Sequence, residues 1–171
     1  MINEKDVPIT PLLDEDVALF EKWLEKDYIY KWLCTTGEEE RQAWVDEIKG
    51  RHDTHRHMKH FIVSVGKQEK IGFGLCVDLF HDPAYVKEFY EDLAGTIREN
   101  EAYELGYFIG EEAFLNQGLG KIIIQKLEDK VTELGGKLLL ADPDEKNIPS
   151  IKVLMANGFQ KVKDGDYRKA L

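Results

Sequence analysis

Two glycines one residue apart, Gly118 and Gly120, precede a long apolar run in the stretch LNQGLGK, residues 115–121. The apolar residues that follow recur at helical spacing, so the glycines lie where a loop enters a helix. Free backbone amides at a helix N-terminus, together with the helix dipole, favour an anion. The glycines either let a pyrophosphate approach the backbone or only turn a corner. The stretch is therefore a candidate phosphate-binding loop.

Two familiar phosphate-binding loops do not fit this spacing. A Walker A loop requires GxxxxGK followed by Ser or Thr, but here GLGK is followed by Ile122 and the first glycine is missing. A dinucleotide fingerprint requires GxGxxG, and Ile123 occupies the position of its third glycine. The ligand of the loop therefore has to be inferred from the elements around it.

The elements that position the loop are clearest in the second half of the chain. Apolar residues at helical spacing alternate there with short apolar runs of strand length. Gly135 and Gly136 can end the first helix in a left-handed cap, and Asn147 can cap the second helix. The expected order is a strand at 103–109, a helix at 119–134, a strand at 137–141, a helix at 147–157 and a hairpin of 159–162 and 167–170.

The first half of the chain adds further strands and helices. Residues 61–65 and 71–79 flank the polar turn GKQEK, which is typical of a hairpin. The Asp82 and Pro83 pair predicts the start of a helix after this hairpin. A short strand at 7–10 and helices at 14–25 and 38–49 complete the list. These elements predict an α/β (α+β) fold in which helices flank a mixed sheet of six to seven strands.

Composition limits the class of protein. A chain of 171 residues with 43% hydrophobic residues can bury one sizeable core, which predicts a single domain over residues 1–171. Cys34 and Cys76 lack CxxC spacing, so we expect reduced thiols. The sequence contains no apolar run behind a basic start and no membrane-length apolar run. We therefore expect a cytoplasmic protein with no membrane partner.

The charge of the chain argues against a nucleic-acid partner. The net charge is −10, whereas a phosphate backbone requires a basic surface. Residues 88–112 are especially acidic and contain a single base, Arg98. This segment is either a solvated surface or an acidic wall that attracts a cationic substrate.

A histidine-rich segment, RHDTHRHMKH, raises the question of a metal site. It holds four of the five histidines, which are His52, His55, His57 and His60. Arginine and lysine side chains are interleaved with them and would repel a metal cation. We therefore predict a solvated connector between a helix and a strand, and no metal site.

Two stretches resemble the core of the GNAT superfamily of acetyl-CoA-dependent N-acetyltransferases. They are YELGYFIGEEAFLNQGLGKIIIQKLEDKV and LLLADPDEKNIPSIKVLMANGF, within about residues 103–160. The succession of strand, glycine loop, long helix, Ala-Asp-Pro and Asn-to-Gly-Phe makes the resemblance specific. NIPSIKVLMANGF is similar to the branch that modifies ribosomal protein N-termini. FEKWLEKDYIYKWL and ADPDEKN are similar to aminoglycoside 6′-N-acetyltransferases.

The resemblance implies acetyl-CoA as the cofactor. In the family, the strand before the loop pairs with the pantetheine arm, and the glycine loop wraps the pyrophosphate. By that likeness the backbone of Phe108, Ile109 and Gly110 faces pantetheine, and Asn147 lies beside the same arm. The amides expected to face the pyrophosphate are those of Asn116, Gln117, Gly118, Leu119, Gly120 and Lys121.

The sequence departs from the family pattern at two positions. Leu115 stands where the loop often begins with Gln or Arg, which removes a side-chain contact to the coenzyme. Leu154 stands where many relatives carry a tyrosine that protonates the leaving thiolate. The source of that proton is therefore open.

The implied reaction is amine attack on a thioester carbonyl. An aliphatic ammonium has a pKa near 10.4, so freeing its lone pair at pH 7 costs roughly 4 to 5 kcal/mol unless the site helps. In the family layout Glu104 and Asp142 fall near the acyl end of the coenzyme. Our hypothesis is that Asp142 anchors the amine while Glu104, directly or through a water, takes the proton. A backbone amide of Phe108 or Ile109 would stabilise the oxyanion.

The acceptor is expected to be cationic. Tyr30, Trp32 and Tyr85 either line an acceptor pocket or belong to apolar helix faces, and aromatic rings beside acids suit an ammonium. The sequence thus predicts acetyl transfer to a primary amine of an aminoglycoside-like or polyamine-like small molecule, by a monomer or a homodimer. The alternatives are acetylation of a protein N-terminus or lysine, and a module that binds acyl-CoA without turnover.

Overall fold

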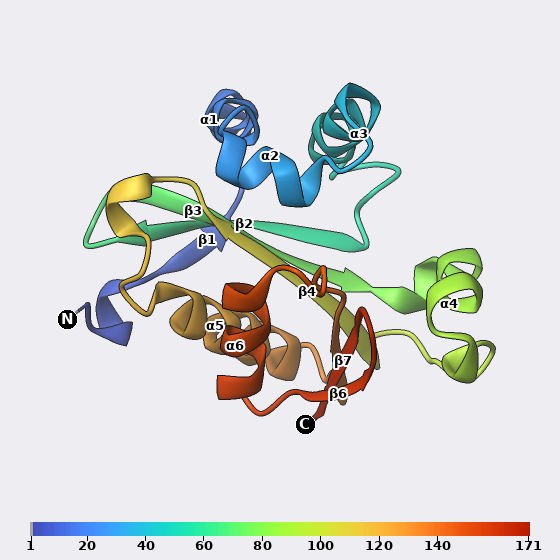
Figure 1. The fold of residues 1–171 in the computed structure, drawn as a ribbon. Helices are drawn as coiled ribbons and strands as arrows, with labels where there is room; N and C mark the ends of the chain where they lie inside the picture. The colour runs from blue at the N-terminus through green and yellow to red at the C-terminus, as the bar shows by residue number, and fades with distance from the viewer. Residues whose placement is uncertain (1) are drawn as a thin grey trace.

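A seven-stranded mixed sheet forms the centre of the computed structural model, which describes residues 2–171 (Figure 1). The strand order is β1-β2-β3-β4-β5-β7-β6, with β4 and β5 parallel and the other neighbours antiparallel. The predicted fold class is confirmed. The strands are β1 (Ile9–Pro11), β2 (Met58–Val65), β3 (Glu69–Asp78), β4 (Ala102–Ile109), β5 (Leu138–Ala141), β6 (Gln160–Lys163) and β7 (Asp166–Ala170).

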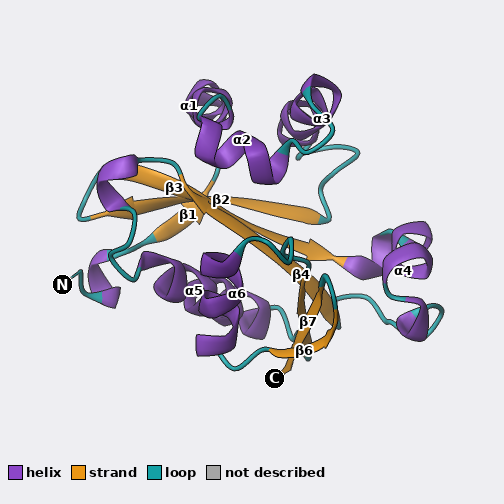
Figure 2. Cartoon of the chain, viewed as in Figure 1, coloured by secondary structure: helices purple, strands orange, loops and turns teal. Residues whose placement is uncertain are grey.

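Helices cover both faces of the sheet (Figure 2). On one face lie α1 (Val17–Leu24), α2 (Asp27–Leu33) and α3 (Glu38–Lys49), and on the other lie α5 (Leu119–Glu133) and α6 (Ile148–Ala156). A further helix, α4 (Pro83–Phe89), follows the end of β3. Each face has its own apolar core, one centred on α1 to α3 and one on α5 and α6. The sheet is thus a partition between two helical layers.

Helix α5 forms where its sequence predicts. Ile123, Leu127 and Val131 lie one helical turn apart and are fully buried against the sheet. Gly118 precedes the helix with a φ of 76°, and Gly135 follows it with a φ of 87°. Both angles belong to the left-handed region that favours glycine. The two glycines therefore set where the helix begins and ends.

Helix α2 is not among the predicted elements. It has seven residues, and Tyr28, Ile29, Tyr30 and Trp32 all have modest helix propensity. A helix this short is not stable alone and depends on its contacts with the rest of the protein. The C-terminal end of α2 is hydrogen-bonded to α3, because the indole Nε1 of Trp44 donates to the carbonyl of Leu33 at 2.9 Å.

The turn after β4 is packed directly against α1. A Cβ atom on Gly110 would lie 2.3 Å from the indole ring of Trp23, which is fully buried. The Trp23 Nε1 group donates to Glu111 Oε1 at 2.7 Å, and Lys26 Nζ donates to the Gly110 carbonyl at 2.6 Å. Glycine is therefore required at position 110 for close approach of the two segments.

We expect the substitution Gly110→Ala to destabilise the protein by about 1 to 3 kcal/mol, because the added methyl overlaps the Trp23 ring. Urea denaturation followed by circular dichroism measures this change. The matched control is Gly106→Ala on β4, where the nearest atoms to a new Cβ belong to Leu75 at 3.8 Å. Equal stability of the two variants would contradict the proposed packing constraint.

Candidate active site

The parallel strands β4 and β5 pair over a short distance and then separate. Their register joins Ala102 to Leu138, Tyr103 to Leu139 and Glu104 to Leu140. Beyond Glu104, β4 continues to Ile109 and pairs with no described strand on its β5 side. Backbone N–H and C=O groups on that open edge need a partner. The gap between the strands is therefore a natural place for a ligand.

Two cavities of about 250 Å³ each lie along this gap. One, the coenzyme-side cavity, extends to the start of α5, and the other, the acceptor-side cavity, extends toward α3 and the end of β5. The two cavities adjoin, because several residues line both. These shared residues are Trp32, Leu33, Tyr107, Phe108, Asn147 and Ser150.

The coenzyme-side cavity ends at the N-terminus of α5. Asn116 and Gly118, with φ angles of 58° and 76°, bend the chain so that the first helical turn faces the cavity. No side chain in the described part of the chain caps this helix, so its first amides have no intrahelical partner. Gly120 lies close under Tyr107, since a Cβ there would be 2.8 Å from the tyrosine oxygen. The arrangement suits an anion.

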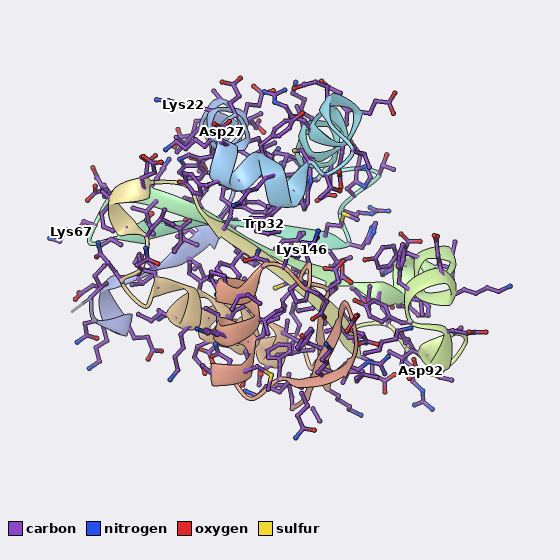
Figure 3. All side chains as sticks on the ribbon, viewed as in Figure 1. Lys22, Asp27, Trp32, Lys67, Asp92 and Lys146 are labelled. Carbon is purple, nitrogen blue, oxygen red and sulfur yellow. The ribbon has the colours of Figure 1, made fainter. Side chains whose placement is uncertain are left out.

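The acceptor-side cavity is aromatic and acidic. Trp32 of α2, Trp44 of α3 and Phe73 of β3 form apolar walls. The carboxylates of Glu40, Asp142 and Asp144 also line it, whereas no Lys, Arg or His of residues 2–171 does so. Figure 3 labels Trp32 below α2, on the side of the loop that leads to α6. The cavity is therefore suited to a cation.

Glu104 and Asp142 lie together where the strands separate. The Tyr85 hydroxyl is 3.2 and 3.1 Å from the two Glu104 oxygens and 3.4 Å from Asp142 Oδ2. The hydroxyl of Tyr90, which is buried, donates to Glu104 Oε2 at 2.6 Å. One phenol thus contacts both carboxylates, and a second phenol contacts Glu104 alone.

The surroundings of these acids favour their protonated forms. Desolvation, followed by the charge of Asp142, raises the pKa of Glu104 to about 8, although the two tyrosine hydrogen bonds oppose the shift. Desolvation also raises the pKa of Asp142 to about 6, even though its side chain is open to the cavity. Two acids with raised and different pKa values in one cleft are typical of acid–base chemistry.

Comparison with known proteins decides the family. The sequence profile of the acetyltransferase (GNAT) domain matches residues 7–160. The chain belongs to the GNAT acetyltransferase family. It is therefore an N-acetyltransferase, of a family that uses acetyl-CoA as its cofactor. No curated protein matches the sequence. Among residues 2–171, no helix combines the length and apolarity needed to cross a membrane.

Solved structures share the GNAT fold at low sequence identity. AAC(6')-Ib in complex with ribostamycin and coenzyme A has a TM-score of 0.75 and 16% identity, covering 96% of this chain and 93% of that one. Protein bh2621 from Bacillus halodurans has a TM-score of 0.76 and 15% identity, covering 95% and 81%. A domain from Methanocaldococcus jannaschii DSM 2661 has a TM-score of 0.73 and 21% identity, covering 96% and 98%.

Most residues that the GNAT resemblance assigns to the coenzyme line the coenzyme-side cavity. They are Phe108, Ile109, Asn116, Gly118, Leu119, Gly120 and Asn147. The Asn147 side chain also caps α6, accepting from the Ser150 amide at 3.3 Å. Gln117 and Lys121 do not line the cavity. The Gln117 side chain donates to the Ala113 carbonyl at 2.5 Å, and Lys121 is exposed.

The Gly110 backbone, which the resemblance assigns to pantetheine, is hydrogen-bonded within the protein. Its amide donates to the Ile71 carbonyl at 2.7 Å, and its carbonyl accepts from Lys26 Nζ and from the Tyr28 hydroxyl. Gly110 does not line either cavity. Residues far earlier in the chain occupy its polar groups, which the local sequence pattern does not reveal.

The predicted acceptor-lining aromatics divide into three cases. Trp32 lines both cavities. Tyr30 lines neither cavity, because its hydroxyl points to Glu38 at 3.4 Å near the start of α3. Tyr85 lies beside the acid pair and does not line either cavity. Only Trp32 therefore sits where the sequence analysis expected an acceptor wall.

Sequence reasoning missed several residues in and around the two cavities. Tyr90, Trp44 and Glu40 were not singled out, although Trp44 and Glu40 lie one helical turn apart on α3. Ser150 and Tyr107 are the hydroxyl-bearing residues that line both cavities. Leu154 is buried and lines the acceptor-side cavity, so no phenol replaces the family tyrosine at that position.

The histidine-rich segment lies away from the two cavities. His57 is near His81, with ring centroids 5.4 Å apart, and His60 Nε2 is 2.7 Å from Glu47 Oε1. Within residues 2–171, no group of three or more His, Cys, Asp or Glu side chains is arranged to hold a metal ion. Residues 51–57 join α3 to β2, as expected of a connector, but residues 58–60 belong to β2. Arg51 and His60 are buried, so the prediction of a fully solvated segment is wrong at these two residues.

The raised pKa of Glu104 makes stability depend on pH. Its folded-state pKa of about 8 exceeds the ordinary 4.5, so the folded state binds this proton more tightly than the unfolded state. The stabilisation is present at low pH and is lost as pH rises from about 4.5 to about 8. We therefore expect Glu104→Gln to gain about 1 to 3 kcal/mol over the wild type above pH 8.

Urea denaturation of both proteins at a series of pH values measures this difference. Glu88→Gln is the matched control, because Glu88 is exposed on α4 and should leave the pH dependence unchanged. A constant difference between Glu104→Gln and the wild type from pH 4 to pH 9 would contradict the assigned environment of Glu104.

Proposed function

We propose that the protein transfers the acetyl group of acetyl-CoA to a primary amine of a cationic small molecule, aminoglycoside-like or polyamine-like. The observation that carries this proposal is the lining of the acceptor-side cavity. Three carboxylates and two tryptophans line it, without a basic side chain from the described residues. Such a lining attracts an ammonium-bearing acceptor and disfavours an anionic one.

The residues of the coenzyme-side cavity fit acetyl-CoA. The unpaired first amides of α5, behind Gly118, would hold the pyrophosphate. The open edge of β4 would pair with the amides of the pantetheine arm, and Asn147 would lie beside it. When bound, acetyl-CoA supplies the thioester whose acetyl group the amine takes. Leu115 adds an apolar contact where many relatives place a polar one.

The alternation of β4 selects between the two proposed oxyanion donors. The amide of Gly110 donates to Ile71 of β3, and an antiparallel strand sends alternate amides to the same neighbour. The amide of Phe108 is therefore turned to β3, whereas that of Ile109 is turned to the open edge. Of these two amides, only that of Ile109 can therefore donate to a ligand in the gap, and Ile109 lines the coenzyme-side cavity.

Asp142 and Glu104 have different roles: one binds the ammonium group and the other accepts its proton. Asp142 lines the acceptor-side cavity, so its carboxylate binds the incoming ammonium. Glu104 lies behind it and takes the proton that the amine loses, because its raised pKa makes it a competent base near neutral pH. We propose that the hydroxyl of Ser150 or Tyr107 passes a proton to the leaving sulfur, since both residues line both cavities.

We extend the proposal to domain organisation, cellular location and partners. We infer a single catalytic domain over residues 1–171 that acts in the cytoplasm, without a nucleic-acid or membrane partner. The rival acceptor is a protein N-terminus or lysine, and a rival of another class is a module that binds acyl-CoA without turnover. Leu115 and Leu154 motivate the second rival, since both replace polar residues of the family pattern.

Release of the CoA thiol from acetyl-CoA tests the function. Purified protein is assayed against aminoglycosides, polyamines and short peptides with free N-termini, with an acceptor-free blank. We expect turnover well above the blank with an aminoglycoside or a polyamine. Turnover with peptides alone would favour the protein acceptor, and tight acetyl-CoA binding with no turnover on any amine would favour the binding module.

The substitution Asp142→Asn should lower kcat/KM for the amine by roughly 100-fold, because it removes the carboxylate that binds the ammonium in the cavity. Calorimetric affinity for acetyl-CoA should stay within about twofold. Asp27→Asn is the control, since Asp27 begins α2 and lies outside both cavities. Unchanged turnover in Asp142→Asn would remove Asp142 from the mechanism.

The start of α5 offers a test of coenzyme binding that does not depend on activity. Asn and Asp both tolerate the left-handed φ of 76° at Gly118 and have the same shape. Gly118→Asp should weaken binding of coenzyme A at least 10-fold relative to Gly118→Asn, because only Asp adds a negative charge beside the pyrophosphate. Titration calorimetry measures both. Equal affinities would place the pyrophosphate elsewhere.

A further inference from the structure

The Tyr85 hydroxyl bridges the two carboxylates of the site. It lies 3.1 and 3.2 Å from the oxygens of Glu104 and 3.4 Å from Asp142 Oδ2. A phenol has one proton to donate and lone pairs with which to accept. When one carboxylate is protonated, Tyr85 can accept from it and donate to the other at the same time. No hydrogen bond joins Glu104 to Asp142 directly among the described residues.

The two acids differ in their access to the acceptor. Asp142 lines the acceptor-side cavity, whereas neither Glu104 nor Tyr85 lines it. Glu104 is half-buried between β3 and β5, opposite Val77 and Leu140. An amine in the cavity can therefore reach Asp142, but a proton bound for Glu104 has to pass through another group.

The segment that carries Tyr85 is held in place from two sides. Within the segment the Tyr85 ring packs against Phe89, at 4.7 Å between centroids, and the first outside contact is the hydrogen bond from the Tyr90 hydroxyl to Glu104 on β4. The guanidinium of Arg168 on β7 lies 5.8 Å from the Tyr90 ring centre. Arg168 also binds both oxygens of Asp92, labelled in Figure 3, at 2.7 and 2.8 Å. The bridge is therefore part of a fixed network.

We infer that Tyr85 is a proton relay, which passes to Glu104 the proton that Asp142 removes from the acceptor ammonium. The inference rests on the proposed function and reassigns Tyr85 from an acceptor wall to a positioning residue of the reaction. In this order of events Asp142 is the catalytic residue that contacts the amine, and Glu104 is the final proton acceptor.

The relay balances in protons and charge. The ammonium N–H bond breaks and an O–H bond forms on Asp142, which leaves the amine neutral. The Asp142 proton then moves to the Tyr85 oxygen while the Tyr85 proton moves to Glu104. Tyr85 ends with one proton, as it began, so no tyrosinate forms. Asp142 returns to its charged state. Before the next turnover, the proton on Glu104 leaves by the reverse route, through Tyr85 and Asp142, to the solvent that Asp142 contacts.

The pH dependence of turnover follows from the groups that face Glu104. These are Tyr85 and Tyr90 from the α4 segment, Asp142 after β5, and Asp166 of β7, which is paired with Arg168. Glu104 has to be ionised to receive a proton, and its pKa is raised to about 8. The rate should therefore rise through about pH 8 in the wild type.

The substitution Tyr85→Phe tests the relay, because it keeps the ring against Phe89 and removes only the hydroxyl. We expect kcat on the best amine of the panel to fall roughly 10- to 100-fold, with the calorimetric affinity for acetyl-CoA within about twofold of wild type. The rising limb of the pH profile should shift from near pH 8 to lower pH, because Asp142 then acts without Glu104.

Tyr167→Phe is the matched control, since that hydroxyl also contacts a carboxylate, Glu145, but lies outside both cavities. If Tyr85→Phe does not fold, Glu104→Gln replaces it and should likewise lose the limb near pH 8. Wild-type kcat and an unshifted pH profile in Tyr85→Phe would overturn the relay. Absence of CoA release by the wild type with every amine would instead overturn the proposed function.

Discussion

The early separation of β4 from β5 is the constraint on which the rest of the site depends. The two strands share three residue pairs and part after Glu104 and Leu140. In a continuous sheet, the next residues of β4 would be paired and no ligand could enter between the strands. Here their open edge forms a wall shared by both cavities, and Tyr107 and Phe108 on that edge line each of them. One feature of the sheet therefore provides both halves of the cleft.

The same separation explains the electrostatics of the site. Glu104 is the last paired residue of β4, and Asp142 follows β5 immediately, so the end of the pairing brings the two acids together. Desolvation raises the pKa of both, and Tyr85 and Tyr90 hold Glu104 by hydrogen bonds. Keeping such a pair in one place costs stability near neutral pH, which is common where residues are arranged for acid–base chemistry.

Helix α2 links the two cavities from above the sheet. Four of its residues, Tyr28, Ile29, Trp32 and Leu33, line the coenzyme-side cavity, and the last two also line the acceptor-side cavity. The Tyr28 hydroxyl donates to the carbonyls of Ile109 and Gly110, at 3.1 and 2.8 Å. The helix that lines both cavities is thus anchored to the end of β4.

Local sequence patterns predicted the parts of the site that depend on local physics. The glycines at 118 and 120 and the apolar period of α5 identify the loop and helix, because conformation and periodicity act over a few residues. The pairing of Glu104 with Asp142 was expected from the family resemblance alone. Helix α2, the Tyr90 contact and the occupied backbone of Gly110 were not predicted, since each depends on groups distant in sequence.

A crystal structure of the protein with coenzyme A and a polyamine tests the central claim most directly. We expect pantetheine along the open edge of β4 between residues 105 and 109, the pyrophosphate at the amides of residues 119–121, and an amine on Asp142. Coenzyme A bound away from the β4 edge, or a polyamine bound outside the cavity lined by Trp32, Trp44 and Asp142, would contradict it.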